Sequence, residues 1–113
     1  MCAFPRIHLF SKENQKTAYF FKALSYTGRL DILEYLENHG PTKVEDLLIV
    51  FPLSDATMSQ HLKILRLANL VTFEEVYPFT YYQVNTAELR LACMAFHFFF
   101  TKFQLDSVSE LTG

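Results

Sequence analysis

The segment that most constrains the fold is the amphipathic run LSDATMSQHLKILRLANLV, which spans residues 53–71. Ser54 stands directly before a helical pattern, where a hydroxyl side chain can accept a hydrogen bond from the first turn of a helix. At about 100° per residue, Met58, Leu62 and Leu65 fall on one face of that helix. The run therefore predicts a short helix that begins after a capping residue and buries one apolar stripe against other helices.

The remaining sides of this helix are polar and carry several small side chains. Glutamine can form two hydrogen bonds with an adenine edge, hydroxyl and imidazole groups can bond bases or phosphates, and lysine can hold phosphate. The same pattern also fits an ordinary amphipathic surface helix, and residues 54–66 alone leave both interpretations open. In the first interpretation the residues that contact DNA are Ser54, Ala56, Thr57, Ser59, Gln60, His61, Lys63 and Arg66.

Three helices are predicted before this run. The first covers about residues 12–25, and the second is TGRLDILEYLENHG, which Gly40 and Pro41 end. The third is TKVEDLLIVF, in which Thr42 and Glu45 have the spacing of a capping box. A few residues then join two short helices, which is typical of a helix-turn-helix.

After the run the pattern changes to that of strands. VTFEEVYPFTYYQV predicts two short antiparallel strands around a tight turn, a wing over about residues 71–85. Asn85, followed three residues later by a glutamate, opens a last helix over about 86–104. With the helix-turn-helix at about 42–69, we predict one mainly α-helical domain over 1–113 with a small β-hairpin. Its architecture is a winged helix-turn-helix of the order α-α-α-α-β-β-α.

Three stretches carry a resemblance to a known family: FFKALSYTGRLDILEYL, LSDATMSQHLKILRLANLV and YYQVN. Over about residues 18–103 the chain resembles the ArsR/SmtB-type arsenic- and metal-sensing repressors. The resemblance implies a homodimeric repressor that binds double-stranded operator DNA, here expected to be an inverted repeat, until an effector loosens its grip. By position, the residues that match the DNA-reading positions of the family are Ser54, Thr57, Ser59, Gln60 and His61.

Aromatic residues crowd the first and last helices, which the resemblance pairs across a dimer axis. A helix that is apolar on every side must be buried, and an obligate dimer interface resembles a core cut in half. We therefore predict dimerisation helices over about 12–25 and 86–104, with an aromatic pocket for a hydrophobic effector as the alternative. The predicted interface residues are Tyr19, Phe20, Leu89, Phe96, Phe99, Phe100 and Phe103.

The sensing sites of the family are where the sequence departs from its pattern. The Cys-x-Cys of many members is missing from VEDLLIV, and the usual zinc pattern is missing from AELRLACMAFHFFFTKF. Cys93 and His97 lie four residues apart, so two copies can supply a tetrahedral zinc set across a two-fold axis. Cys2 and Cys93 can instead form a thiol switch, or Cys93 can be a buried small hydrophobe and His97 an interface residue. The sequence predicts no cofactor and leaves the effector unknown.

The formal net charge of −2 hides a segregated pattern. Residues 1–30 carry five basic residues and one acidic residue, whereas residues 71–85 carry two glutamates, Glu74 and Glu75, and no Lys or Arg. Acidic side chains that face phosphates weaken binding to DNA. The alternative function is therefore a dimeric protein-interaction module of the same fold with weak or no DNA binding.

Phosphate contacts are expected from basic residues outside the wing. The candidates are Lys63 and Arg66 of the amphipathic run, together with Lys12 and Lys16 of the basic N-terminal region. A local basic patch matters more for phosphate binding than the total charge of a chain does. We therefore predict a sequence-specific DNA-binding transcriptional regulator, a homodimeric repressor without the usual metal sites.

Other function classes are not favoured. No apolar run reaches the ~20 residues that span a bilayer. Because the N-terminus also has no clear secretory signal, we expect a cytoplasmic protein without a membrane partner. Ser59 and His61 lie about 200° apart on one helix, and no glycine-rich phosphate loop or nucleophile elbow accompanies them. We therefore expect no enzymatic activity.

Overall fold

The helices and strands follow the order of a winged helix, with one short strand in addition. The computed structural model describes residues 10–103. The mainly α-helical class and the predicted order of four helices, a hairpin and a last helix are confirmed. The elements are α2 (Lys12–Ala23), α3 (Thr27–His39), β1 (Thr42–Lys43), α4 (Val44–Val50), α5 (Asp55–Leu67), β2 (Val71–Val76), β3 (Phe79–Val84) and α6 (Thr86–Thr101).

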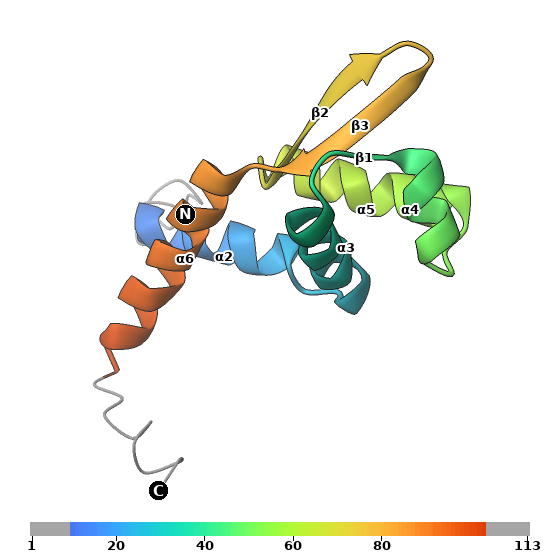
Figure 1. Ribbon diagram of the computed structural model, residues 1–113. Helices are drawn as coiled ribbons and strands as arrows, with labels where there is room; N and C mark the ends of the chain where they lie inside the picture. The colour runs from blue at the N-terminus through green and yellow to red at the C-terminus, as the bar shows by residue number, and fades with distance from the viewer. Residues whose placement is uncertain (1–9, 104–113) are drawn as a thin grey trace, which may run out of the picture.

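The elements form two groups that occupy different parts of the domain. The hairpin of β2 and β3 projects away from the helices, and α6 lies with α2 on the side opposite α4 (Figure 1). α6 packs on α2, whereas α5 packs on α3 and against β2. α6 and the part of α2 that packs on it thus lie apart from the exposed face of α5, whereas the C-terminal end of α2 reaches the core beside α5.

Side-chain caps set the start of three helices. Ser11 accepts a hydrogen bond from the backbone N–H of Asn14 before α2, at 3.2 Å. Ser54 caps α5 through the N–H of Thr57 at 3.2 Å, as the sequence predicts. Asn85 caps α6 through the N–H of Glu88 at 3.3 Å, again as predicted. A cap of this kind satisfies one backbone donor that a first helical turn leaves unpaired.

The predicted capping box before α4 is wrong. Thr42 belongs to β1 and pairs with Tyr82 of β3, so its backbone is extended. Its hydroxyl donates to the carbonyl of Gly40 at 2.8 Å, and the residue that precedes α4 is Lys43, without a side-chain cap. Pairing with β3 therefore takes priority over the local cap, because a strand partner satisfies the backbone of Thr42.

Two helices end at residues with a left-handed backbone. Gly40 ends α3 at φ 74°, which a residue without Cβ adopts without strain. Asn69, at φ 64°, follows α5 and turns the chain toward β2. Asparagine tolerates this region better than most residues do, so both ends match the residue types found there.

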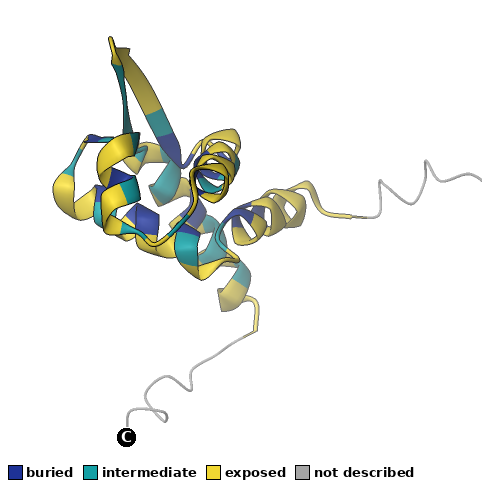
Figure 2. Ribbon diagram, turned by 90° about the vertical axis from the view of Figure 1, so that its right-hand side faces the viewer, coloured by how far each residue is buried: buried dark blue, intermediate teal, exposed yellow. Residues whose placement is uncertain are grey.

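The wing belongs to a three-stranded antiparallel sheet in the order β1-β3-β2. The hairpin register runs from Val71 opposite Val84 to Val76 opposite Phe79, and the turn between the strands is Tyr77–Pro78. At the base of the hairpin Val71 is buried, and Tyr82 and Val84 of β3 pack against the core. The exposed part of the hairpin lies toward its tip (Figure 2).

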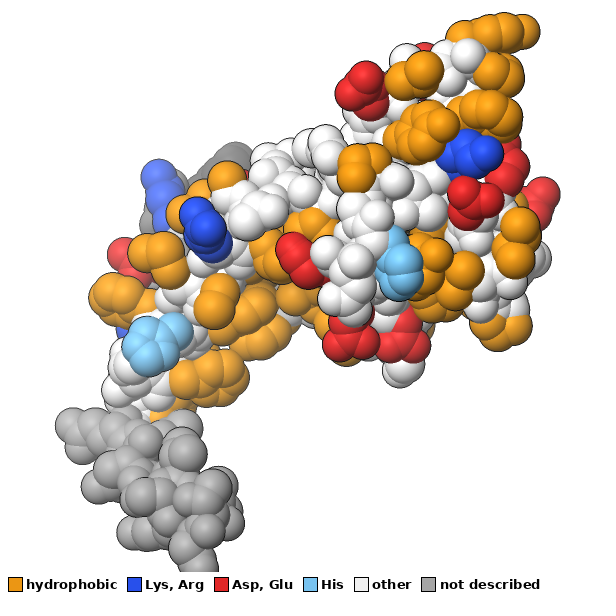
Figure 3. Space-filling view, in the orientation of Figure 1, with side chains coloured by type: hydrophobic (Ala, Val, Ile, Leu, Met, Phe, Trp, Pro, Cys, Tyr) orange, Lys and Arg blue, Asp and Glu red, His pale blue; other side chains and the backbone are white. Residues whose placement is uncertain are grey.

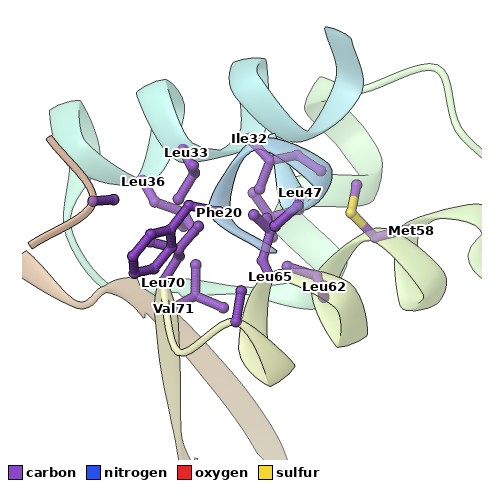
Figure 4. Packing of buried hydrophobic residues seen from close by; sticks show 13 residues of the cluster. Phe20, Ile32, Leu33, Leu36, Leu47, Met58, Leu62, Leu65, Leu70 and Val71 are labelled. Carbon is purple, nitrogen blue, oxygen red and sulfur yellow. The ribbon is translucent and has the colours of Figure 1, made fainter. Parts of the chain in front are cut away.

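One hydrophobic core joins the helices to the base of the hairpin. The predicted stripe of α5 is confirmed, since Met58, Leu62 and Leu65 are at most 2% exposed. Buried side chains from α2, α3, α4 and α5 point toward one another and toward the start of β2 (Figure 4). The buried hydrophobic residues are Phe20, Ala23, Ile32, Leu33, Leu36, Leu47, Met58, Leu62, Leu65, Ala68, Leu70, Val71 and Ala92.

The burial of α5 gives a direct stability prediction. Leu65→Ala should lower the free energy of unfolding by about 2–5 kcal/mol, because Leu65 is completely buried and its removal leaves a cavity. Leu67→Ala is the matched control, since Leu67 is 61% exposed and should cost less than about 0.5 kcal/mol. Urea unfolding at one fixed protein concentration measures both values. Equal losses for the two variants would contradict the assignment of the buried face.

Candidate nucleic-acid interface

One face of α5 is fully available to a partner. Ala56, Gln60 and Lys63 are exposed and lie opposite the buried stripe, and Ser59 is exposed beside them. The small side chain of Ala56 and the longer side chains of Gln60 and Lys63 follow one another along this face. A helix of this form fits a major groove, because the small residue permits close approach while the polar residues reach base edges and phosphates.

The first turn of α5 is rigidly held by its own hydroxyl groups. Ser54 accepts from the backbone N–H of Thr57 and donates to the Thr57 hydroxyl at 3.0 Å. Both residues are exposed. Each hydroxyl oxygen keeps accepting capacity, and the hydroxyl of Thr57 keeps its proton for a further hydrogen bond.

Arg66 lies on the flank of α5 that faces the wing. Its guanidinium carbon is 5.4 Å from the ring centroid of Phe73 on β2, and the residue is exposed. The aromatic face holds the cation at the foot of the hairpin, which is a favourable arrangement for an arginine. Arg66 thus places a positive charge between α5 and the wing.

His61 lies on the other flank and packs against α3. Its Nδ1 is 3.2 Å from a terminal nitrogen of Arg29, and since a guanidinium only donates, Nδ1 accepts this hydrogen bond and carries no proton. The imidazole also lies against Gly28, where an added Cβ would be 3.0 Å from Nε2. The predicted role of His61 in reading DNA is therefore not supported, because this side chain connects α5 to α3.

The pKa of His61 reflects this position. Burial lowers the pKa of the imidazole below its ordinary value, and the positive charge of Arg29 lowers it further. Both causes act against the protonated form, which would lose the hydrogen bond from Arg29. His61 is thus a neutral connector between the two helices.

Arg29 is a buried connecting residue to which the sequence analysis assigned no role. It is 3% exposed, and its Nε donates to the carbonyl of Ala23 at 2.6 Å. A second donor reaches the carbonyl of Lys22 at 3.4 Å, and the ring of Tyr26 lies 4.4 Å from the guanidinium carbon. Arg29 thereby joins the end of α2 to α3 and, through His61, to α5. An arginine inside the apolar pattern TGRLDILEYL was the available signal, since a buried cation requires dedicated partners.

Strand pairing brings a lysine beside the wing, although the wing segment itself contains no Lys or Arg. Lys43 of β1 pairs with Tyr81 of β3, and its Nζ lies 4.2 Å from the ring centroid of Phe79. Glu74 and Glu75 are exposed on β2. On the face seen in Figure 3, hydrophobic side chains dominate the hairpin, with acidic and basic side chains beside them. The wing surface is therefore of mixed charge, because Lys43 offsets part of the acidic charge.

The basic residues of α2 do not all lie near α5. Lys12 and Lys16 line a hollow of about 430 Å³ between α2 and α6. Lys22, in the last turn of α2, instead lines a hollow of about 530 Å³ that reaches Ile64 and Leu67 of α5. The expectation that Lys12 and Lys16 hold phosphate beside Lys63 is therefore not supported by their position.

The predicted interface residues divide into two sets. Phe20 is 2% exposed in the core, contacts Phe96 edge to face at 6.2 Å, and is therefore a core residue and not a subunit contact. Phe96 also stacks on Phe21 at 4.3 Å, and both Phe96 and Leu89 pack against the core. The remaining predicted residues keep exposed or partly exposed surface, and these are Tyr19, Phe99, Phe100 and Phe103.

Three further apolar residues on α6 are exposed and were not predicted as contacts. Leu91 is 46%, Met94 65% and Phe98 64% exposed. They lie on the face of α6 that lines the hollow against α2. Their spacing of three and four residues places them on one helix face, which was the signal available in the sequence.

The candidate sensing residues do not form a metal centre within the described part of the protomer. Between residues 10 and 103 no group of three or more His, Cys, Asp or Glu side chains is placed to hold a metal ion. α4 carries no thiolate, so the described residues do not fit the Cys-x-Cys site of the family. Cys93 and His97 are both exposed on α6, so the idea of a buried Cys93 is wrong for the protomer. Cys2 lies outside the described residues.

The exposed α5, the helix pair α2–α6 and the flanking hairpin together define a winged-helix protein of the DNA-binding type. Residues 27–72 match the family described as "Bacterial regulatory protein, arsR family". The arsenical resistance operon repressor of Bacillus subtilis (strain 168) is 42% identical over 69 residues, which cover 61% of this chain and 66% of that protein. The matched part is thus slightly less than two thirds of the length of this relative. Residues 27–72 are thus similar to ArsR-family regulatory proteins, and the relatives with which the chain aligns are described as a repressor and a possible transcriptional regulator.

Solved structures share the same fold. An ArsR-like transcriptional regulator from Rhodococcus sp. RHA1 aligns with a TM-score of 0.70 and 23% identity, over 87% of this chain and 93% of that one. A possible transcriptional regulator for arsenical resistance aligns with a TM-score of 0.65 and 27% identity, over 81% of this chain and 91% of that one.

Among residues 10–103, no helix has the length and apolar character needed to cross a membrane.

The position of His61 predicts a pH dependence of stability. Because its pKa is lowered in the folded protein, the unfolded chain binds this proton more tightly. The free energy of unfolding should therefore fall as the pH falls below about 6.5, the usual histidine value. His61→Gln should show a smaller fall between about pH 7 and 5, whereas His97→Gln, a change at an exposed residue of α6, should follow the wild type. Urea unfolding at each pH measures the free energy of unfolding of the three proteins. Identical pH profiles for the wild type and His61→Gln would contradict the role of His61 in this pH dependence.

Proposed function

We propose that this chain is a homodimeric transcriptional repressor that binds an inverted-repeat operator through α5. The observation that carries the proposal is the exposed polar face of α5, with Ala56, Gln60 and Lys63 in line along it. The opposite face of the same helix is completely buried, so the polar face is presented rigidly. A rigid element with a small residue and polar residues in this order is suited to a major groove.

Each residue of this face has a distinct role in the proposed complex. Gln60 bonds an adenine edge, and Ser59 bonds a neighbouring base or phosphate. Lys63 and Arg66 bind phosphates, which fixes the helix in its groove without reading the sequence. Lys43 and the aromatic residues near it on the hairpin meet the backbone beside the groove, which moderates the effect of the acidic wing.

The proposed dimer forms through α2 and α6. Both helices carry exposed apolar side chains, and α6 alone presents Leu91, Met94 and Phe98 on one face. Exposed apolar surface of this kind on packed helices is typical of a subunit interface. A two-fold axis beside α6 would relate two copies of α5, which matches the symmetry of an inverted repeat. As a DNA-bound repressor without a membrane partner, the protein would act in the cytoplasm.

The described residues do not fit the Cys-x-Cys metal site of the family in α4, because this helix carries no cysteine. The alternative function is a dimeric interaction module of the same fold with weak or no DNA binding. A salt titration separates the two, because contacts with phosphates make affinity fall steeply with salt. A repressor should bind its operator with a dissociation constant in the nanomolar range at moderate salt. Weak binding to every duplex selected from random DNA would contradict the repressor hypothesis.

The division of roles on α5 gives a mutational prediction. Gln60→Ala should lower the preference for the operator over random duplex by about 1–3 kcal/mol, because it removes a bidentate base contact. Lys63→Ala should weaken binding to both duplexes and flatten the slope of log affinity against log salt by about one unit. Fluorescence anisotropy with operator and random duplexes over a range of salt measures both effects. Equal effects of the two changes on both duplexes would refute this division.

The proposed interface gives a second prediction. Phe98→Ser should shift the protein from dimer to monomer, because it places a polar group at an exposed apolar position of α6. Ile49→Ser is the control, since Ile49 is 81% exposed on α4, outside the proposed interface. Sedimentation velocity over a range of protein concentrations measures the dissociation constant. A dimer of unchanged strength in Phe98→Ser would rule out this face of α6 as the contact.

A further inference from the structure

A hollow lies beside α5, between the end of α2 and the start of α3. Its volume is about 530 Å³, and Lys22, Ser25, Tyr26 and Arg29 line it from the α2–α3 side. Ile64, Leu67 and Ala68 of the last turns of α5 form its other side. The proposed DNA contacts described above do not use this hollow.

The hollow opens beside the face of α5 that is proposed to enter the groove. Leu67 stands seven residues after Gln60, so two helical turns place both on the same side of α5. Leu67 is 61% exposed although it lines the hollow. The hydroxyl of Tyr19 donates to the carbonyl of Leu67 at 3.0 Å, which fastens the end of α5 to α2. A partner that lies along α5 therefore also passes the mouth of the hollow.

The charge of the hollow is positive. Lys22 is exposed at its rim, and no acidic residue lines it. Arg29 is 3% exposed and forms its hydrogen bonds with two backbone carbonyls and a neutral imidazole, none of which cancels its charge. A buried cation without a carboxylate partner attracts an anion electrostatically over a longer distance than an exposed ion pair does, because its charge is neither cancelled nor fully screened by water. The hollow is therefore suited to an anion.

A hydroxyl group and an apolar side complete the surface. Tyr26 is 60% exposed and lies over the guanidinium of Arg29, with its hydroxyl free of any hydrogen-bond partner among residues 10–103. A phenol can donate to a phosphate oxygen, and Ile64 and Leu67 offer an apolar surface to a deoxyribose. Phosphate beside sugar is the pattern of a nucleic-acid backbone.

We propose that this hollow binds the backbone of the DNA strand next to the groove that α5 reads, with Lys22 and Tyr26 on one phosphate. The inference rests on the proposed function and adds a contact to it, from a part of the chain outside the helix-turn-helix. Lys22 takes the role that the sequence suggested for Lys12 and Lys16, because it is the lysine of α2 that lines the hollow beside α5. The contact fixes the angle at which α5 enters the groove, since α2 and α5 are fastened together at Leu67.

The test compares two lysines of the same helix. Lys22→Gln should weaken binding to operator and random duplex alike by several-fold and should flatten the salt slope by about one unit. Lys16→Gln is the matched control, because Lys16 is exposed on α2 but lines the other hollow. It should bind with the wild-type slope. Both changes are at exposed positions, and sedimentation velocity checks that both proteins keep the oligomeric state of the wild type.

A second variant tests the hydroxyl group. Tyr26→Phe keeps the ring over Arg29 and removes only the hydroxyl, so it should weaken binding to both duplexes while the salt slope stays that of the wild type. An unchanged affinity in Tyr26→Phe would remove Tyr26 from the contact.

Three outcomes overturn the inference, and the third is a case of the second that also identifies what the hollow binds instead. If the wild type binds no duplex, the proposed function fails and the contact fails with it. If the wild type binds and Lys22→Gln keeps its salt slope, only the backbone contact is refuted. If Lys22→Gln binds duplex like the wild type but loses a stabilisation by inorganic phosphate that the wild type shows in thermal unfolding, the hollow takes a free anion and not DNA.

Discussion

The burial of one side of α5 is the constraint on which the rest of the molecule depends. Met58, Leu62 and Leu65 lie in the core shared with α3 and β2, so α5 cannot rotate without exposing apolar surface. This fixed rotation decides where every other side chain of the helix points. Gln60 and Lys63 face outward, Arg66 faces the wing, and His61 faces α3. The surface offered to a partner is therefore set by the hydrophobic core behind it.

Local signals in the sequence predicted the elements well. The caps at Ser54 and Asn85, the apolar stripe of α5 and the change to a hairpin pattern depend on residues a few positions apart, and the structure contains all of them. The end of α3 at Gly40 follows from a residue type that adopts positive φ easily. Periodicity and capping are properties of a segment, so a single sequence reveals them.

Features that depend on distant residues could not be predicted. β1 has two residues and exists because Thr42 and Lys43 pair with β3, about forty residues later. The same pairing brings Lys43 to a wing that has no basic residue of its own. Phe20 lies in the core and His61 turns toward Arg29, a partner 32 residues away. For Phe20 and His61 the sequence predicts in part on which face of its helix the side chain lies. It does not predict which distant residues that side chain contacts.

Gly28 has a consequence for how this chain can vary. Its α-carbon hydrogen faces the imidazole of His61, and a Cβ at this position would approach Nε2 to 3.0 Å. The distance between α3 and α5 is therefore matched to a residue without a side chain opposite a ring. A larger residue at position 28 would displace the ring of His61, and through it the hydrogen bond from Arg29, unless position 61 became smaller at the same time. Among related chains, these two positions should therefore change together, and that covariation would record the contact between α3 and α5.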